Sequence, residues 1–163
     1  MEFAPWLQKK LVVPEKIEEI VQTIRNEKKT IATLNGSFDL LHAGHLYIIH
    51  QASMKADVLF VLLNSDQSIR AYKSLKRPII ELKYRLQMVA ALEFVNYVTW
   101  FDEIDPRKIL EKIRPDVHVN GAEYGESCIE AETVKNMGAV LHLVDRIEGL
   151  ATTSVIERVK QCV

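Results

Sequence analysis

Two histidines, His42 and His45, stand three residues apart in the segment N-G-S-F-D-L-L-H-A-G-H at residues 35–45. On a helix, this spacing places both imidazoles on nearly the same face. Gly36 and Gly44 carry no side chain, so a ligand or a phosphate group can approach the backbone closely there. A helix that begins here also directs unpaired N–H groups and the positive end of its dipole toward the same point. These features predict a site for an anion that gains negative charge during a reaction.

Two less specific interpretations of the histidine pair stay open. The spacing also suits half of a zinc site, but no cysteine or third histidine is suitably placed, so no metal held by protein side chains is expected. A chance pair of capping or core histidines is the commoner origin of H-x-x-H alone. The preceding strand pattern, the two glycines and Asp39 argue against that origin here. Neither a Walker A loop nor G-x-G-x-x-G occurs, which disfavours ordinary ATPases and dinucleotide-binding proteins.

The rest of the chain alternates between strand and helix patterns. Apolar runs typical of strands buried on both faces occur at residues 30–34, 57–63, 95–101, 116–119 and 139–144. Helical patterns are found at 14–29, 45–56, 81–93, 105–113, 129–137 and from about 152. This alternation predicts an α/β fold, a single Rossmann-like domain whose five-stranded parallel sheet has helices on both faces. Ligands of such sheets bind after the carboxyl ends of the strands, here residues 35–45, 64–78, 120–127 and 146–153.

The composition suits one soluble domain. Of 163 residues, 48% are hydrophobic, and 21 Lys+Arg against 22 Asp+Glu leave a formal net charge of −1. This balance argues against intrinsic disorder and against a bulk electrostatic binder of nucleic acid. No apolar run approaches the length of a membrane span, the N-terminus lacks a secretory pattern, and two cysteines are too few for a disulfide framework. We therefore expect a cytoplasmic protein with no nucleic-acid or membrane partner.

Residues 35–45 closely resemble the signature of the cytidylyltransferase-like nucleotidyltransferase superfamily, G-x-F-D-x-x-H-x-G-H. The resemblance extends over roughly residues 11–160 and includes N-S-D at 64–66, Arg70, Lys73, R-P-I at 77–79, Arg85 followed by A-A-L, P-D-V at 115–117, Gly121, Tyr124 and T-T at 152–153. It implies a nucleotidyltransferase domain of the HxGH type at residues 30–163. Residues 1–29 would form an N-terminal segment whose amphipathic helix packs on this domain.

Members of this family transfer a nucleotidyl group from a nucleoside triphosphate to a sugar or alcohol phosphate and release pyrophosphate. The acceptor phosphate needs no general base, so catalysis rests on alignment and charge stabilisation. The resemblance implies catalytic roles for His42, His45 and Lys73. It implies further nucleotide contacts from Gly36, Ser37, Phe38, Asn120, Gly121, Glu123, Thr152 and Thr153. It implies substrate contacts from Asp39, Asn64, Asp66, Lys73, Arg77, Arg85 and Arg146. Mg²⁺ would accompany the triphosphate, held mostly by phosphate and water.

Several of these residues also have a structural interpretation that stays open. Residues 65–66 suit a helix cap, and residues 152–153 would cap the last helix equally well. Taken alone, Lys73, Lys76 and Arg77 are better interpreted as a solvated basic loop. Arg85 could pair with a neighbouring carboxylate such as Glu81, one helical turn earlier. The remaining histidines match no motif and are expected to be packing or surface residues: His50, His118 and His142.

Departures from the family pattern bear on substrate choice. Asn120 replaces a lysine of the pattern, Glu123 an aspartate, and Ala151 a small polar residue. Residues 145–149 resemble the R-T-E-G of glycerol-phosphate and phosphoethanolamine cytidylyltransferases. The leading helix and the N-S-D, R-P-I and A-A-L segments instead resemble the heptose-1-phosphate adenylyltransferases of lipopolysaccharide-core biosynthesis.

The resulting hypothesis is AMP transfer from ATP to a heptose 1-phosphate, which forms an ADP-sugar. The first alternative is a cytidylyltransferase that uses CTP and glycerol 3-phosphate or a similar alcohol phosphate. The second alternative is a non-catalytic, nucleotide-binding regulatory domain. A homodimer is expected, because this family commonly forms one.

Overall fold

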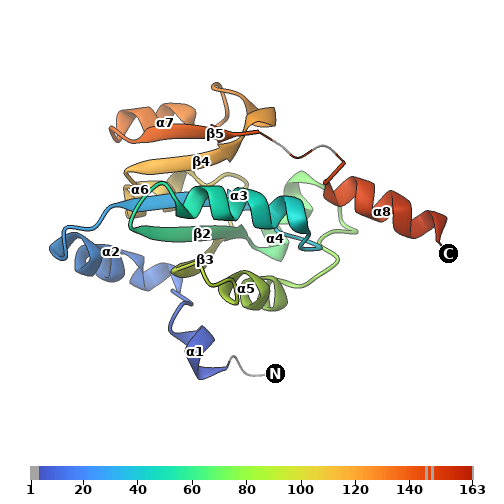
Figure 1. Cartoon of the computed structure of the whole chain (residues 1–163), viewed down its shortest axis with the longest axis horizontal. Helices are drawn as coiled ribbons and strands as arrows, with labels where there is room; N and C mark the ends of the chain where they lie inside the picture. Colours follow the sequence, from blue (N-terminus) through green and yellow to red (C-terminus); the bar gives the residue numbers. More distant parts are fainter. Residues whose placement is uncertain (1–3, 146, 148, 163) are drawn as a thin grey trace.

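The computed structural model describes residues 4–145, 147 and 149–162, and a parallel sheet forms its centre. In this part of the chain, five strands lie in the order β3-β2-β1-β4-β5, and every neighbouring pair is parallel (Figure 1). The strands are β1 (Ile31–Gly36), β2 (Val58–Asn64), β3 (Tyr97–Phe101), β4 (Val117–Gly121) and β5 (Val140–Val144). The predicted α/β Rossmann-like fold is confirmed.

Helices cover both faces of the sheet. They are α1 (Pro5–Gln8), α2 (Ile17–Asn26), α3 (Ala43–Ser53), α4 (Asp66–Tyr72), α5 (Leu82–Ala90), α6 (Arg107–Ile113), α7 (Ala131–Asn136) and α8 (Thr152–Gln161), with the 3₁₀ turns η1 (Pro14–Lys16) and η2 (Ala122–Tyr124). Apolar residues of α1, α3 and α5 pack on one face, and those of α2, α6 and α7 pack on the other. The side chains of β2 alternate between the two cores, which explains the continuous apolar run of that strand.

The N-terminal segment is built onto the edge of the sheet. The N–H group of Val98 in β3 donates to the carbonyl of Lys10 (2.8 Å), and the N–H group of Val12 donates back to the carbonyl of Val98 (2.9 Å). Ile17 and Ile24 of α2 are buried in the same core as α6. The apolar stripe of this helix therefore packs on the domain, and the edge of β3 is covered by backbone.

The structure differs from the predicted elements after β2. The sequence of residues 64–78 reads as polar loop, yet α4 occupies half of it. Ser65 is the N-cap of α4, and its Oγ accepts the N–H group of Ser68 at 3.2 Å, which confirms the capping interpretation. Helix α4 escapes detection by periodicity because Ile69 is its only buried apolar residue among those the structure describes.

The last helix, α8, projects beyond the sheet (Figure 1). None of its described residues is fully buried. Across the described ranges, the helices are too short or too polar to cross a membrane.

Candidate active site

A pocket of about 230 Å³ opens where β1 and β4 end. The strand order reverses between these neighbours, which is where sheets of this type bind ligands. The lining comes from β1 and the start of α3, from α4's C-cap, from the end of β4 with η2, and from the chain between β5 and α8. Predicted site residues that line it are Gly36, Ser37, Phe38, His42, His45, Lys73, Asn120, Gly121, Glu123, Thr152 and Thr153.

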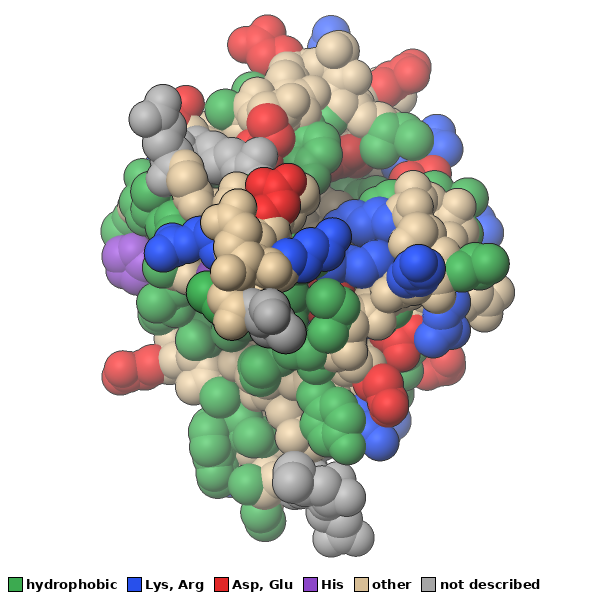
Figure 2. All heavy atoms as spheres, turned by 90° about the vertical axis from the view of Figure 1, so that its right-hand side faces the viewer, with side chains coloured by type: hydrophobic (Ala, Val, Ile, Leu, Met, Phe, Trp, Pro, Cys, Tyr) green, Lys and Arg blue, Asp and Glu red, His purple; other side chains and the backbone are tan. Residues whose placement is uncertain are grey.

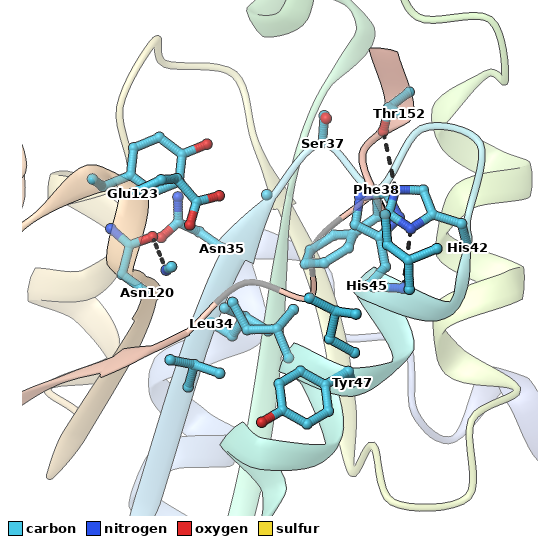
Figure 3. Close-up of a pocket in the computed structure, with 18 of the residues that line it drawn as sticks. Leu34, Asn35, Ser37, Phe38, His42, His45, Tyr47, Asn120, Glu123 and Thr152 are labelled. Atoms are coloured by element: carbon cyan, nitrogen blue, oxygen red, sulfur yellow. Dashed lines mark hydrogen bonds between the residues drawn. The ribbon is translucent and has the colours of Figure 1, made fainter. Parts of the chain in front are cut away.

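The pocket has two chemically different ends (Figure 3). The histidine end contains Ser37, Phe38, His42, His45, Lys73 and Thr152. The β4 end contains Asn120, Gly121 and Glu123. The two ends lie on opposite sides of the carboxyl end of β1 (Figure 3).

His42 is the N-cap of α3, and its own ring provides the cap. Its Nδ1 accepts the N–H group of Gly44 at 3.1 Å. A neutral ring whose Nδ1 accepts must carry its proton on Nε2. The Nε2 atom lies 3.4 Å from Oγ1 of Thr152, so the capping bond turns the N–H side of the ring toward the start of α8.

His45 stacks on His42, as the three-residue spacing predicts. The ring centroids are 3.9 Å apart and the ring planes differ by 25°. Phe38 meets His45 edge to face, with centroids 5.5 Å apart. A Cβ atom at Gly44 would lie 2.9 Å from the carbonyl oxygen of Leu150 and 3.0 Å from Cε1 of His42. Glycine is therefore needed for the capping ring and for the close approach of the segment before α8.

The loop between β1 and α3 has an uncommon backbone conformation. Phe38 and Leu40 have φ angles of 46° and 51°, a region that residues other than glycine rarely adopt. Asp39 lies between them and is 1% exposed. Its carboxylate accepts the N–H groups of residues 79–80, each at 2.9 Å, and forms an ion pair with Arg77 at 3.1 Å. These contacts hold the strained loop in place.

Arg85 is completely buried and joins the ends of β1 and β2. Its guanidinium donates to the carbonyl oxygens of Ser37 (2.5 Å) and Asn64 (2.9 Å). It also forms an ion pair with Asp66 at 2.7 Å. The alternative pairing with Glu81 is therefore wrong. Arg85 instead holds together the backbone at the ends of β1 and β2, beside the pocket.

Five residues predicted to contact substrate do not line the pocket: Asp39, Asn64, Asp66, Arg77 and Arg85. Asp39, Asn64 and Arg85 are buried and already hydrogen-bonded within the protein, so the prediction that they contact substrate directly is corrected. Asp66 and Arg77 are partly exposed but pair with Arg85 and Asp39. Arg146 lies outside the described residues.

Lys73 reaches the pocket from the C-cap of α4. Its Nζ donates to Oγ of Ser37 at 3.0 Å. Burial lowers the pKa of Lys73, and the nearby charge of Arg77 lowers it further. Lys73 and Lys76 are both exposed, but Lys76 does not line the pocket, so the interpretation of a solvated basic loop suits Lys76 better than Lys73. Figure 2 shows a band of Lys and Arg side chains across the face on which α8 projects.

At the β4 end, both the nitrogen and the oxygen of the Asn120 side-chain amide form hydrogen bonds. Its Nδ2 donates to Oε1 of Glu130 at 2.6 Å, and its Oδ1 accepts the N–H group of Gly121 at 2.9 Å. Oε1 of Glu130 also lies 3.5 Å from Nε2 of His118, and Nδ1 of His118 lies 2.8 Å from Oγ1 of Thr33. This buried chain of polar groups supports the end of β4.

Glu123 lies directly over Gly121. A Cβ atom at Gly121 would overlap the Glu123 carboxylate, so the glycine provides the space that this carboxylate fills. This geometry explains why glycine stands at position 121, two residues before Glu123.

Thr152 connects α8 to the histidine end. Ala151 is the N-cap of α8 and makes no side-chain capping bond. Oγ1 of Thr152 instead lies 3.4 Å from the carbonyl oxygen of Asp39 and 3.4 Å from Nε2 of His42. The alternative in which Thr152 or Thr153 caps this helix is therefore wrong.

The model of the cytidylyltransferase-like family matches residues 33–158, a range that contains both ends of the pocket. The chain belongs to the cytidylyltransferase-like family. Relatives of this cytidylyltransferase-like chain include the bifunctional protein HldE of Syntrophotalea carbinolica, 36% identical over 151 residues, and that of Koribacter versatilis, 39% identical over 158 residues. These matches cover 92% and 96% of this chain but 31% and 32% of the relatives. The chain thus spans about a third of the length of the curated relatives it matches.

Two solved structures share the fold of this chain. The lipopolysaccharide core biosynthesis protein of Thermoplasma volcanium superposes with a TM-score of 0.60 and 25% identity, covering 73% of this chain and 97% of that one. The pantoate-beta-alanine ligase of Francisella tularensis superposes with a TM-score of 0.64 and 15% identity, covering 92% and 77%. The second likeness shows a shared fold alone.

The structure also adds residues to the site of this cytidylyltransferase-like chain. Asn35 and Tyr47 line the pocket; Asn35 is the first residue of the segment 35–45, and Tyr47 follows that segment by two residues, so extending the motif could have found both. Glu130 and His118 lie behind the wall, and no motif or spacing indicates them. His118 does prove to be a packing residue, as expected, but one within a polar network.

Proposed function

We propose that this chain transfers AMP from ATP to a heptose 1-phosphate, releases pyrophosphate and forms an ADP-sugar for lipopolysaccharide-core biosynthesis. The observation that carries this proposal is the stacked pair of His42 and His45 at the N-terminus of α3, inside the pocket. Two imidazoles and a helix N-terminus suit a triphosphate. The sequence resemblance to heptose-1-phosphate adenylyltransferases and the likeness to a lipopolysaccharide core biosynthesis protein support the choice of acceptor.

In the proposed reaction, an oxygen of the acceptor phosphate attacks the α-phosphorus of ATP. The bond between that phosphorus and the bridging oxygen breaks, and its electron pair leaves with pyrophosphate. His42 and His45 contact triphosphate oxygens and stabilise the charge that accumulates there. No proton has to be removed from the nucleophile, so alignment and electrostatics provide the acceleration.

The nucleoside extends from the histidine end toward the β4 end. There the Glu123 carboxylate accepts hydrogen bonds from the ribose hydroxyls, as acidic residues do in dinucleotide-binding folds. Lys73 balances negative charge of the two substrates at the histidine end. Asp39 and Arg85 act as positioning residues, because their charges hold the loop that carries the histidines.

Magnesium fits this pocket as a companion of the triphosphate. Within the described ranges, no three His, Cys, Asp or Glu side chains are grouped to hold a metal ion. The lining of the pocket still offers the carboxylate of Asp145. Mg²⁺ commonly binds through one or two carboxylates, substrate phosphates and water, and when bound it would neutralise triphosphate charge.

A homodimer is also part of the proposal. The apolar stripe of α2 is used within the chain, with Ile17 and Ile24 buried, so another surface would have to form the contact. Light scattering at micromolar concentration tests this, and a monomer would remove the dimer from the proposal.

The decisive experiment measures pyrophosphate release with Mg²⁺ for ATP or CTP against heptose 1-phosphate or glycerol 3-phosphate. Release confined to ATP and heptose 1-phosphate is expected. Release confined to CTP would replace the proposal with the cytidylyltransferase alternative, which residues 145–149 favour. Nucleotide binding without release for either acceptor would favour a regulatory domain.

A further inference from the structure

Glu130 is a buried carboxylate that the proposed reaction does not use. It stands at the N-cap position of α7 and is 3% exposed, outside the lining of the pocket. Its Oε1 accepts from Nδ2 of Asn120 at 2.6 Å and lies 3.5 Å from Nε2 of His118. A carboxylate buried this deeply is costly unless it is paired and hydrogen-bonded, so its position suggests a role beyond packing.

The surroundings of Glu130 keep it ionised. Burial acts to raise the pKa of Glu130, but the nearby His118, whose Nε2 lies 3.5 Å away, and the backbone N–H group at the start of α7 outweigh it and leave the pKa below its ordinary value. A charged acceptor makes the bond to Asn120 short and directional. Asn120 is thereby held in one amide orientation.

That orientation determines what the β4 end presents to a nucleotide. While Nδ2 of Asn120 donates to Glu130, Oδ1 of Asn120 accepts the backbone N–H group of the next residue, Gly121. Both polar atoms of this amide are thus used within the protein, and Asn120 is 6% exposed. The backbone of Gly121 and the Glu123 carboxylate that lies over it line the pocket at this end. Asn120 holds the N–H group of Gly121, and Gly121 provides the space that the Glu123 carboxylate fills.

We infer that Glu130 is a positioning residue for the nucleotide, which acts through Asn120 on Gly121 and Glu123. This inference rests on the proposed nucleotidyl transfer and deepens it. Glu130 touches neither substrate. It determines the affinity for the nucleotide and leaves the acceptor and the chemical step at the histidine end unaffected.

Two substitutions separate this role from mere packing. Glu130→Ala removes the acceptor of Asn120, and the KM and Kd for ATP are expected to rise about tenfold, the cost of one charged hydrogen bond. The KM for the acceptor and kcat should stay within about twofold. Glu130→Gln keeps an oxygen at the Oε1 position that can accept the hydrogen bond from Asn120, so it should restore ATP affinity to within about twofold of wild type.

Thr99→Val is the matched control for altering a buried polar residue. Thr99 is completely buried in β3 and lies outside the pocket, so its substitution is expected to leave the KM values for ATP and for the acceptor unchanged. If Glu130→Ala does not fold, Asn120→Asp takes its place. It sets a second carboxylate against Glu130 and should give the same selective loss of ATP affinity.

The inference is overturned if Glu130→Gln binds ATP as weakly as Glu130→Ala, or if the KM values for ATP and acceptor rise together. It is also overturned if wild type does not bind ATP. Calorimetric Kd values for ATP are measured without any acceptor. A wild type that binds ATP but transfers nothing to heptose 1-phosphate would therefore refute the proposed function, while the Kd values of the variants still judge the role of Glu130.

Discussion

The two ends of the pocket are held in place by opposite physical means. At the histidine end, Phe38 and Leu40 adopt positive φ angles, and the loop is fixed by Asp39 with Arg77 and by the buried Arg85. At the β4 end, Gly121 has ordinary extended backbone paired with β5, and the side chain of Asn120 links the strand end to the buried carboxylate of Glu130. The histidine end thus combines backbone strain with several side-chain contacts, whereas the β4 end combines ordinary strand pairing with one side-chain tether to Glu130.

This difference matches the work each end would do. Groups that stabilise developing charge must be fixed before the reaction, because reorganising them costs activation energy. Redundant ion pairs and hydrogen bonds at the histidine end provide this rigidity. A base-recognition and ribose-recognition region instead contributes binding, where the loss of one contact changes affinity without stopping chemistry. Substitutions at the two ends should therefore affect different kinetic constants.

The largest effect is expected from His42→Asn. Asparagine is a good N-cap residue, so α3 should remain folded, but Nε2 is lost from the histidine end. We expect kcat for pyrophosphate release to fall about 10²- to 10³-fold, as when one preorganised donor to a developing charge is removed. The Kd for ATP should change far less. His50→Asn is the control, since His50 is exposed on the last turn of the same helix. Equal losses in both variants would refute the comparison.

Asp39→Ala should give the next largest effect, mainly as a loss of stability. Arg77 and the two N–H groups of residues 79–80 lose their carboxylate, and the loop of positive φ angles is released. We expect the free energy of unfolding in urea to fall by roughly 3 kcal/mol, and the KM values for both substrates to rise together.

Asp57→Ala is the matched control for Asp39→Ala. The carboxylate of Asp57 also accepts two hydrogen bonds, from the N–H group and Oγ1 of Thr30, but at the opposite end of the sheet. It should lower stability less and leave both KM values unchanged. A parallel rise of KM in this variant would mean that general stability, and not the loop, controls binding.

Glu123→Gln should act at the β4 end alone. Removing the charge weakens the proposed bonds to the ribose, and the KM for ATP should rise about tenfold while the acceptor KM stays constant. In the variant, 2′-deoxy-ATP should lose less affinity relative to ATP than in wild type. Glu126→Gln, in the same loop but outside this pocket, is the control. A change in kcat without a change in the KM for ATP would place Glu123 outside the ribose contact.

Sequence reasoning predicted the sheet and the histidine end because both are encoded in contiguous residues. The apolar run of residues 57–63 requires burial on both faces, and residues 35–45 hold a complete motif. The β4 network was not predictable in this way, because Glu130 is ten residues from Asn120 along the chain. Only the fold reveals that the two side chains meet.

The predicted substrate contacts of Asp39 and Arg85 fail for one physical reason. A motif shows which residue type a site requires at a position. It does not show whether a charged residue there holds a loop or binds a ligand, because both roles give the same sequence pattern. Burial separates the two cases, since both side chains are bonded to backbone groups that would otherwise be unsatisfied.

The smallest effect, and the finest test of the histidine end, comes from Lys73→Arg. Burial and the charge of Arg77 lower the pKa of Lys73, so this side chain loses its proton at a lower pH than an ordinary lysine. If its charge aids the reaction, kcat/KM should fall as the pH rises through that lowered pKa. Arginine stays protonated, so Lys73→Arg should extend the activity to higher pH and change the neutral rate only a few-fold.

Lys76→Arg, in the same loop but outside the lining of the pocket, should leave the alkaline limb of the profile in place. An alkaline limb that does not move in Lys73→Arg would show that the titration of Lys73 is not felt by the reaction. The charge compensation at the histidine end would then come from the two imidazoles and the N-terminus of α3, because Arg77 and Arg85 are already committed to Asp39 and Asp66.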